Sequence, residues 1–547
     1  MKNIVLSTRS MRDLDAQAKQ NDLEKGYALM KQAGSALFRL VTAKPQTNVA
    51  VFVGGGNNGG DGLVLARLLQ QAGIPFNVYS LAPVEKFKNE AKMALDDFLS
   101  ERGKITYIGD SAGNKNCAED KDCASSLNSA RKFFAGIPNF SVVVDCMLGN
   151  GAQGELRPAI AAAVREINSW NIPVIAADAP TGYDSAEHGR REPCIVANET
   201  MLFGFPRLDA YTCEGGPVFG HVTVANLDYP EDLVAKFDER IFLANESDIP
   251  QMLPKRNEWG EKRDQGCAMI VAGSKDMPGA AALCTKAALR SGTGLVTLAS
   301  PDAVMPILQS KLTEPVFCSL CDMDGQDCDS VDDRAATFAP AHIPQVLAAL
   351  HHNQALAIGP GLGSSECTQS AVLELLGKIQ CPTVIDADAL NAIATLNKTV
   401  ASTTSGAYSF LKSLKTVAVL TPHKREFERL FGRLPEKETD IPNHLRKLAT
   451  ETRKTILLKG APTYIAFDDG RVYVLPVANS GMAKGGSGDV LTGIIVALLA
   501  QGMGTNEAAL LGALLHQKAG ECARRDLGSF SMLPSDVVRR LPKAFGI

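Results

Sequence analysis

The sequence predicts an α/β protein with two domains, and three observations lead to this prediction. The chain has 547 residues, which is too long for one compact core at about 150 residues per domain. In both halves, apolar strand-like runs alternate with helical patterns, which indicates parallel sheets covered by helices on both faces. A charged connector at roughly 229–256 separates the two patterns, so we expect domains at 1–235 and 236–547.

The front half begins with a helix-like stretch, and its elements follow in regular order. We predict a helix at 10–42, a buried strand at 48–53 and, after a glycine-rich loop, a helix at 60–72. Further elements are predicted as strands at 76–80, 142–146, 174–178 and 221–224 and a helix at 159–169. A parallel sheet with helices on both faces is a Rossmann-like three-layer sandwich.

The back half repeats the alternation but not the sequence of the front half. Strands are predicted at 269–273, 355–359, 383–388, 417–421 and 455–459. Because we find no internal repeat, we expect two different domains rather than a duplicated one.

The composition excludes several classes of function. With 45% hydrophobic and 21% charged residues the chain fits a globular protein, and its net charge of −4 provides no broad basic surface for nucleic acid. No apolar stretch approaches the roughly 20 residues that cross a bilayer, and the N-terminus lacks the apolar core of a signal peptide. We expect a cytoplasmic protein; an organelle such as the mitochondrion remains an alternative.

The loop at 54–62 reads GGGNNGGDG and contains the GxGxxG pattern. Between a strand and a helix, such a loop lets backbone amides approach a phosphate at the helix N-terminus. An ordinary dinucleotide-binding dehydrogenase would also need an acidic residue at the end of the next strand to hold a ribose. That strand ends in Ser80-Leu81, so the pattern disfavours such an enzyme.

Two carboxylates, Asp145 and Asp178, stand at the ends of predicted strands. The carboxyl ends of parallel strands border the crevice in which open α/β sheets bind ligands. Either residue alone could be a helix cap, but two of them facing an anion-binding loop favour acid–base chemistry.

These motifs resemble those of the NAD(P)H-hydrate epimerases over roughly residues 1–230. The likeness lies in NNGGDG at 57–62, DCMLGNG at 145–151, DAPTG at 178–182 and the opening SMRDLD at 10–15. It implies substrate contacts by Asn57, Asn58, Gly59, Gly60, Asp61, Gly149, Asn150, Gly151, Ala152, Gln153, Gly154, Glu155 and Asp178. It also implies a potassium ion held by Asn58, Asp145 and Thr181, where Thr181 replaces the usual serine and keeps its hydroxyl. The implied reaction interconverts the R and S hydrates at C6 of the reduced nicotinamide, with Asp145 and Asp178 as the candidate catalytic groups.

The back half contains a second glycine loop, NSGMAKGGSGD at 479–489, which precedes an apolar helix. Amides at the start of that helix would form an anion hole. Asp489 lies in the first turn, where it could cap the helix or take a proton from a hydroxyl that attacks a phosphoryl group. The GGSGD context favours the second interpretation. No Walker motif GxxxxGK[ST] is present.

This loop resembles that of the ribokinase-like fold, and the surrounding motifs resemble the NAD(P)H-hydrate dehydratases from about 250 to 547. They are MPGAA at 277–281, GPGLG at 359–363, DADALN at 386–391, TPH at 421–423 and KGAPT at 459–463. The likeness implies hydrate contacts by Ala280, Gly361, His423 and Asp489. It implies nucleotide contacts by Lys459, Gly460, Ala461, Pro462, Thr463, Gly485, Gly486, Ser487 and Gly488.

The implied reaction uses ATP or ADP, with Mg²⁺ on the phosphates, to remove water from the S hydrate and restore NADH or NADPH. Asp489 is the candidate catalytic base. One segment departs from the family, because Glu261-Lys262-Arg263 stands where His-Lys-Gly is usual. The expected partners are the hydrated dinucleotide, the adenine nucleotide and further copies of the chain in a homo-oligomer, with neither nucleic acid nor membrane.

Two other functions stay open at this point. A kinase for a hydroxymethylpyrimidine or thiazole alcohol would share the GGSGD loop, although it would leave the front half unexplained. A binding protein with a degenerate epimerase domain would need no catalytic carboxylates, whereas Asp145 and Asp178 are present.

Overall fold

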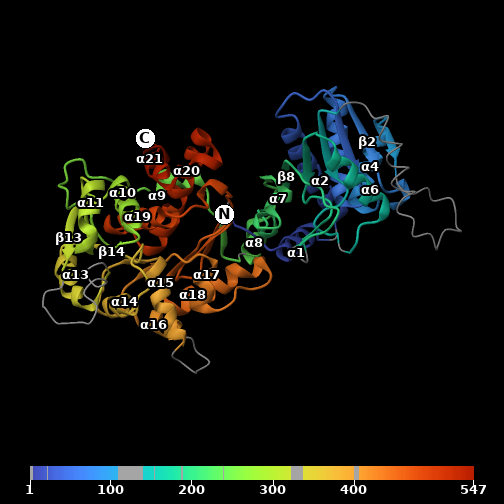
Figure 1. Cartoon of the computed structure of the whole chain (residues 1–547). Coiled ribbons are helices and arrows are strands. Elements are labelled where there is room, and N and C mark those ends of the chain that lie inside the picture. The colour runs from blue at the N-terminus through green and yellow to red at the C-terminus, as the bar shows by residue number, and fades with distance from the viewer. Residues whose placement is uncertain are drawn as a thin grey trace. The chain divides into compact units, whose positions relative to one another are not determined.

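The computed structural model describes residues 4–20, 22–108, 140–152, 154–185, 189–237, 239–321, 337–398 and 406–546. The chain divides into two compact units, one of residues 1–241 with 437–439 and one of 242–436 with 440–547. Each unit has its own sheet flanked by helices (Figure 1). Within the described ranges, no helix has both the length and the apolar character needed to cross a bilayer.

The first unit contains a seven-stranded sheet in the order β3-β2-β1-β4-β5-β8-β9. Its strands are β1 (Val49–Val53), β2 (Phe76–Ser80), β3 (Ile105–Tyr107), β4 (Val142–Cys146), β5 (Val174–Ala177), β8 (Glu199–Phe203) and β9 (His221–Ala225). All neighbours in this sheet are parallel, which confirms the predicted parallel sheet. The sequence did not predict β3, which has three residues, or β8, which opens with two polar residues.

Side chains of β1 alternate between two separate apolar cores. Val49, Val51 and Val53 join the core formed with α2 (Leu23–Val41), α3 (Asn57–Gln71) and α4 (Asn89–Ser100). Ala50 and Phe52 join the other core, with α6 (Pro158–Ser169). Because successive strand residues point to opposite faces, this division confirms the three-layer sandwich.

The helix predicted at 10–42 is wrong as a single element. The structure has α1 (Thr8–Lys19) followed by α2. Gln20 has a φ of 51° and Asp22 caps α2 by accepting from the amides of Glu24 and Lys25, so the chain turns between the two helices. Helix α3 begins at Asn57, three residues before the predicted start, and takes the glycine-rich segment into its first turns.

The second unit contains a ten-stranded sheet in the order β10-β19-β18-β17-β16-β15-β14-β11-β12-β13. Its strands are β10 (Ile241–Leu243), β11 (Cys267–Val271), β12 (Leu295–Pro301), β13 (Val316–Leu320), β14 (Ala355–Ile358), β15 (Thr383–Ile385), β16 (Ala418–Leu420), β17 (Thr455–Leu458), β18 (Thr463–Ala466) and β19 (Val472–Leu475). Neighbours from β13 to β17 are parallel, and β18 pairs antiparallel with β17 and β19. The charged connector, for which no strand was predicted, contains β10.

Helices cover this sheet on both sides (Figure 1). Helices α10 (Pro278–Arg290), α19 (Ser487–Ala500), α20 (Thr505–Ser531) and α21 (Pro534–Ala544) share one apolar core with β11 and β12. Figure 1 shows α14 (Glu366–Lys378), α15 (Ala387–Thr395), α16 (Gly406–Ser413), α17 (Lys424–Phe431) and α18 (Ile441–Thr452) on the other side. Because β15, β16 and β17 are parallel, the loops that follow them lie at the same edge of the sheet. The first turn of α19 lies at this edge too, since a Cβ at Gly488 would be 3.7 Å from Asp386 Oδ2.

Candidate active sites

In the first unit, the glycine loop joins the carboxyl end of β1 to α3. Asn58, in the first turn of α3, is only 8% exposed. Neither polar atom of its side chain has a hydrogen-bond partner in the described part of the chain. A buried amide without partners costs free energy, so this side chain is suited to a ligand that is absent from the free fold.

Asp145 lies near the end of β4 and is fully buried. Its carboxylate accepts hydrogen bonds from the amides of Met147 (3.1 Å) and Thr181 (2.8 Å) and from the Thr181 hydroxyl (2.7 Å). Burial raises the pKa of Asp145 to about 6, although these three hydrogen bonds oppose the shift. The structure thus brings Asp145 and Thr181 together, as the predicted cation site requires.

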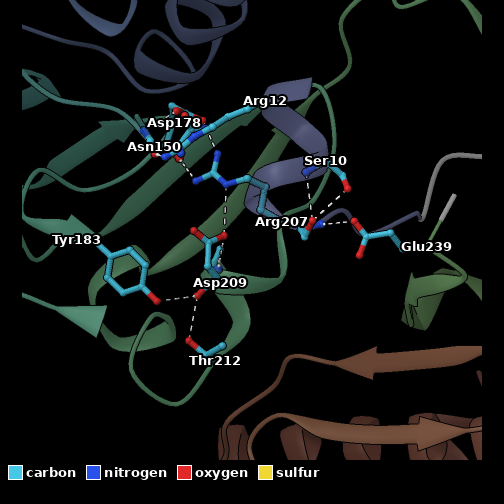
Figure 2. Close-up of polar contacts among 11 residues, drawn as sticks. Ser10, Arg12, Asn150, Asp178, Tyr183, Arg207, Asp209, Thr212 and Glu239 are labelled. Carbon is cyan, nitrogen blue, oxygen red and sulfur yellow. Dashed lines mark hydrogen bonds and ion pairs between the residues drawn. The ribbon is translucent and has the colours of Figure 1, made fainter. Parts of the chain in front are cut away.

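Asp178 follows β5 and occupies a strained backbone conformation, with a φ of 62°. Its Oδ2 accepts from the amide of Asn150 at 2.9 Å. Its Oδ1 forms an ion pair with Arg207, which also donates to the Asp178 carbonyl at 2.9 Å (Figure 2). A Cβ added at Gly149 would lie 3.0 Å from Asp178 Oδ2 and 3.3 Å from Asn58 Cβ, so these residues border one space.

Arg207 is a site residue that the sequence analysis missed. It is fully buried, and its Nε lies 3.3 Å from Asp209 Oδ1 while its other end holds Asp178. Figure 2 shows it between the two carboxylates, with Arg12 reaching the Asn150 carbonyl nearby. Nothing in the local sequence around Arg207 matches a motif, because the pairing depends on the tertiary fold.

These groups surround a cavity of about 610 Å³ in the first unit. Of the predicted contacts, it is lined by Asn57, Asn58, Asp61, Gly149, Asn150, Gly151, Ala152 and Asp178. Gly59, Gly60, Gly154 and Glu155 do not line it, and Gln153 lies outside the described residues. Four basic residues that were not predicted as contacts also line it: Arg12, Lys19, Lys86 and Arg157. These cations suit the phosphates of a dinucleotide.

Asp61 is the second carboxyl group that lines this cavity near Asp178. Burial, and then the charge of Asp178, raises the pKa of Asp61 well above its ordinary value. Among its carboxyl groups the cavity therefore presents Asp61, whose pKa is raised, and Asp178, which is paired with an arginine. This arrangement is able to donate and accept protons.

In the second unit, α19 begins directly after the second glycine loop. Gly486, its N-cap, has a φ of 102°, a conformation that favours glycine. Asp489 lies in the first turn, and burial, followed by the charge of Asp386, raises its pKa to about 6. A carboxylate with a pKa near the working pH is an effective general base.

Lys459 and Asp386 form a partly buried ion pair beside this loop. Lys459 Nζ lies 2.8 Å from Asp386 Oδ1, and the Thr492 hydroxyl donates to Asp386 Oδ2 at 2.7 Å. Burial favours the neutral amine, but the charges of Asp386 and Glu426 outweigh it and raise the pKa of Lys459. A Cβ at Gly488 would lie 3.3 Å from Lys459 Nζ, so the cation stands close to the anion loop.

His423 caps α17 rather than packing in a core. Its Nδ1 accepts from the amide of Glu426 at 3.1 Å, and its own amide donates to Glu426 Oε2 at 2.8 Å. The imidazole is about half exposed and lines a second cavity of about 670 Å³.

This second cavity brings together most of the predicted contacts of the back half. They are Lys459, Gly460, Ala461, Thr463, Gly485, Gly486, Ser487, Gly488, His423 and Asp489. Pro462 is absent from its lining, as are Ala280 and Gly361, which contact each other: a Cβ at Gly361 would lie 2.9 Å from Ala280 Cβ. The segment Glu261-Lys262-Arg263 is exposed and lines neither cavity.

Comparison with known proteins identifies both units. Residues 26–208 match the family "YjeF-related protein N-terminus", and residues 268–543 match "NAD(P)H-hydrate dehydratase". The bifunctional NAD(P)H-hydrate repair enzyme Nnr of Moorella thermoacetica is 35% identical over 98% of this chain and 96% of its own length. The enzyme of the same name from Escherichia coli is 28% identical, over 94% of this chain and 89% of its own.

Among solved structures, the ADP/ATP-dependent NAD(P)H-hydrate dehydratase of Bacillus subtilis, co-crystallised with ATP and Mg²⁺, is 29% identical with a TM-score of 0.44. The match covers 55% of this chain and 96% of the Bacillus subtilis chain. The nearly full-length similarity to relatives such as the Moorella enzyme shows that the chain belongs to the family of bifunctional NAD(P)H-hydrate repair enzymes.

Proposed function

We propose that the chain repairs hydrated NADH and NADPH, with the first unit epimerising the R and S hydrates and the second dehydrating the S form with ATP or ADP. The proposal rests on the observation that each unit has its own cavity, which is lined by residues of its own glycine loop and by a carboxylate. A kinase acting on a vitamin alcohol would have no use for the first cavity.

In the first unit, Asp178 is the carboxylate that reaches the substrate. C6 of the hydrate carries a hydroxyl beside the ring nitrogen. Its configuration inverts when the C6–O bond breaks, with a proton supplied to the departing oxygen, and water then adds to the other face of C6 with loss of a proton. Asp178 lines the cavity, whereas Asp145 is enclosed behind it. Asp178 therefore moves the proton, and Asp145 acts through the adjacent cation site.

Three oxygen-bearing side chains would hold the cation at that site. Asn58 offers a buried amide with no partner among described residues, and Asp145 and Thr181 are already joined at 2.7 Å. A potassium ion there would neutralise the Asp145 charge and tie the loop after β4 to α3, and oxygen ligands suit such a hard cation.

In the second unit, Asp489 takes the proton from the C6 hydroxyl as that oxygen attacks the terminal phosphorus of the nucleotide. The bond from this phosphorus to the bridging oxygen breaks, so that ADP leaves when ATP is used and AMP leaves when ADP is used. Amides of residues 485–488 and Lys459 stabilise the transferring phosphoryl group. Mg²⁺, accompanying the nucleotide, would neutralise the phosphates. The C6–O bond then breaks with phosphate as the leaving group, and loss of a C5 proton restores the ring double bond.

The test is to mix the purified chain with hydrated NADH and either ATP or ADP and to follow the absorbance of the reduced nicotinamide. Nucleotide-dependent recovery of NADH from both hydrate forms is expected. A chain that leaves the hydrate unchanged but phosphorylates a hydroxymethylpyrimidine or thiazole alcohol would contradict the proposal.

A further inference from the structure

A second buried carboxylate lies behind Asp178, and the proposed chemistry does not use it. Asp209, in the short helix η2 (Leu208–Tyr211), has a fully buried side chain and does not line the first cavity. Its Oδ1 accepts from the amide of Ala210 at 3.1 Å and from Arg207 Nε at 3.3 Å. Its Oδ2 is shielded from solvent and has no hydrogen-bond partner in the described part of the chain.

The carboxylate of Asp209 is costly for the stability of the first unit. A buried carboxylate oxygen without a partner loses its hydration and gains no hydrogen bond in return. The cluster also holds two carboxylates, those of Asp178 and Asp209, against the single guanidinium of Arg207, so one negative charge is not balanced within it. A neutral side chain of the same shape would avoid both costs. The charge at position 209 therefore serves the site rather than the fold.

Arg207 connects Asp209 to Asp178 (Figure 2). It is fully buried and does not line the cavity. Its Nε donates to Asp209, its Nη1 pairs with Asp178 Oδ1, and its Nη2 donates to the Asp178 carbonyl at 2.9 Å. Burial alone would lower the pKa of Arg207, but the charges of Asp178 and Asp209 outweigh it and raise this pKa. The guanidinium is thus charged, and all three of its nitrogens are engaged.

The contacts of Arg207 hold both the main chain and the side chain of Asp178. The φ of Asp178 is 62°, a conformation that non-glycine residues adopt at a cost, and the hydrogen bond to its carbonyl stabilises it. The contact with Oδ1 leaves Oδ2 at the amide of Asn150, a residue that lines the cavity. Because the guanidinium is a rigid plane, turning it would break one of these contacts. The orientation of Arg207 therefore determines where the reactive carboxylate lies.

We propose that Asp209 is a positioning residue of the epimerase site, which acts through Arg207 to fix the carboxylate of Asp178 at the cavity. This inference rests on the proposed role of Asp178 in epimerisation. The charge of Asp209 holds the Nε end of the guanidinium, and the other two nitrogens then hold Asp178. A hydrogen bond between charged groups is about twice as strong as a neutral one, so loss of the charge lets the guanidinium turn.

Asp209→Asn tests this role, because it keeps the size of the side chain and the acceptor Oδ1 but removes the charge. Recovery of NADH from purified R hydrate with ATP measures epimerisation in the full chain. We expect kcat to fall at least about fivefold, since a charged hydrogen bond becomes a neutral one. KM should stay within about twofold, because no residue that lines the cavity is changed. The melting temperature should not fall, because the variant removes a buried charge with an unpartnered oxygen.

Asp184→Asn is the matched control, because Asp184 is also a buried carboxylate paired with an arginine, Arg191, and does not line the cavity. Its kcat should equal that of the wild type. In the Arg207→Lys chain, which lacks the planar guanidinium, adding Asp209→Asn should lower kcat little further, because the two residues act as one unit. An unchanged kcat in the folded Asp209→Asn chain, or a full second loss in the lysine background, would overturn the proposal.

A crystal structure of the Asp209→Asn chain separates failure of this inference from failure of the proposed function. A wild-type chain that does not convert the R hydrate would count against the proposed function. The positioning is then read directly from the variant, in which Asp178 Oδ2 should no longer meet the amide of Asn150. Unchanged positions of Arg207 and Asp178 in that structure would overturn the proposal.

Discussion

At the scale of single residues, Asp489 has the surroundings that a general base requires. Its pKa of about 6 follows from burial beside Asp386, while Lys459 limits the shift. Asp489→Asn keeps the size of the side chain but removes the base. We expect turnover of the S hydrate to fall by at least about 10²-fold, since positioned proton transfer contributes about 10²–10⁴-fold. Nucleotide affinity and melting temperature should change little.

The pH profile supplies the control for this prediction. The carboxylate form of Asp489 is populated above pH 6 and is lost as the pH falls through that value. The kcat/KM for dehydration should therefore decline about tenfold per pH unit below 6, with the chain still folded. Normal turnover by a folded Asn variant, or a flat acid limb, would leave Asp489 as a helix cap only.

We expect Arg207 to contribute both to the stability of the first unit and to its activity. Arg207→Met leaves Asp178 and the fully buried Asp209 without their cation. Breaking a buried pair in this way costs about 3–5 kcal/mol, so the free energy of unfolding of the first unit should drop by that order and epimerisation should be lost. Denaturant unfolding followed in that unit measures the change.

Arg67→Met is the matched control, because Arg67 also pairs with two carboxylates, Asp97 and Glu101, but at a partly exposed site. Exposed pairs contribute about 0–1 kcal/mol. Similar losses of free energy of unfolding in both variants would show that burial does not determine how much the Arg207 ion pairs contribute to stability.

Site residues were predictable where a local motif carried them. Asn58, Asp178 and Asp489 stand in glycine loops or at strand ends, whose positions follow from the alternation of elements. Arg207 was not predictable, because it reaches Asp178 from a segment without a motif. Its role depends on side-chain pairing across the fold.

At the scale of elements, close backbone packing explains the glycines at the start of α3. A Cβ at Gly59 would lie 1.8 Å from the carbonyl oxygen of Gly54, whereas a Cβ at Gly56 would have no atom within 4 Å. Gly59→Ala must therefore displace the loop, and we expect epimerisation to be lost while dehydration persists. Gly216→Ala, at a glycine that does not line the cavity and whose added Cβ would meet no atom within 4 Å, should retain both activities, measured with separated R and S hydrates. Equal behaviour of the two variants would contradict this account.

Several strands that are buried at every residue were predicted, whereas β12, β13, β18 and β19 of the second sheet were not. Strands such as β1 and β4 are buried at every residue, and their apolar runs mark them in the sequence. Strand β10 has three residues inside a charged connector, so its place at the sheet edge depends on pairing with β19. The break between α1 and α2 was missed because the residue with the positive φ, Gln20, is neither a glycine nor an asparagine.

At the scale of the whole molecule, the two units should fold separately. Each has its own sheet and its own apolar core, and a cut between 235 and 236 leaves β10 with the second unit. Fragments 1–235 and 236–547 should each be soluble and unfold cooperatively, the first epimerising and the second dehydrating the S hydrate. Loss of both activities in well-expressed fragments would show that the units depend on each other.

The assignment of epimerisation to the first unit and of dehydration to the second is tested most directly by Asp178→Asn in the full chain. The measurement is the time course of NADH recovery from an equal mixture of R and S hydrates with ATP. The S half should be restored at the normal rate, because Asp489 and the second cavity are unchanged, and the R half should follow only at its spontaneous rate of epimerisation. Equal slowing of both halves, or normal recovery of the R half, would contradict the account.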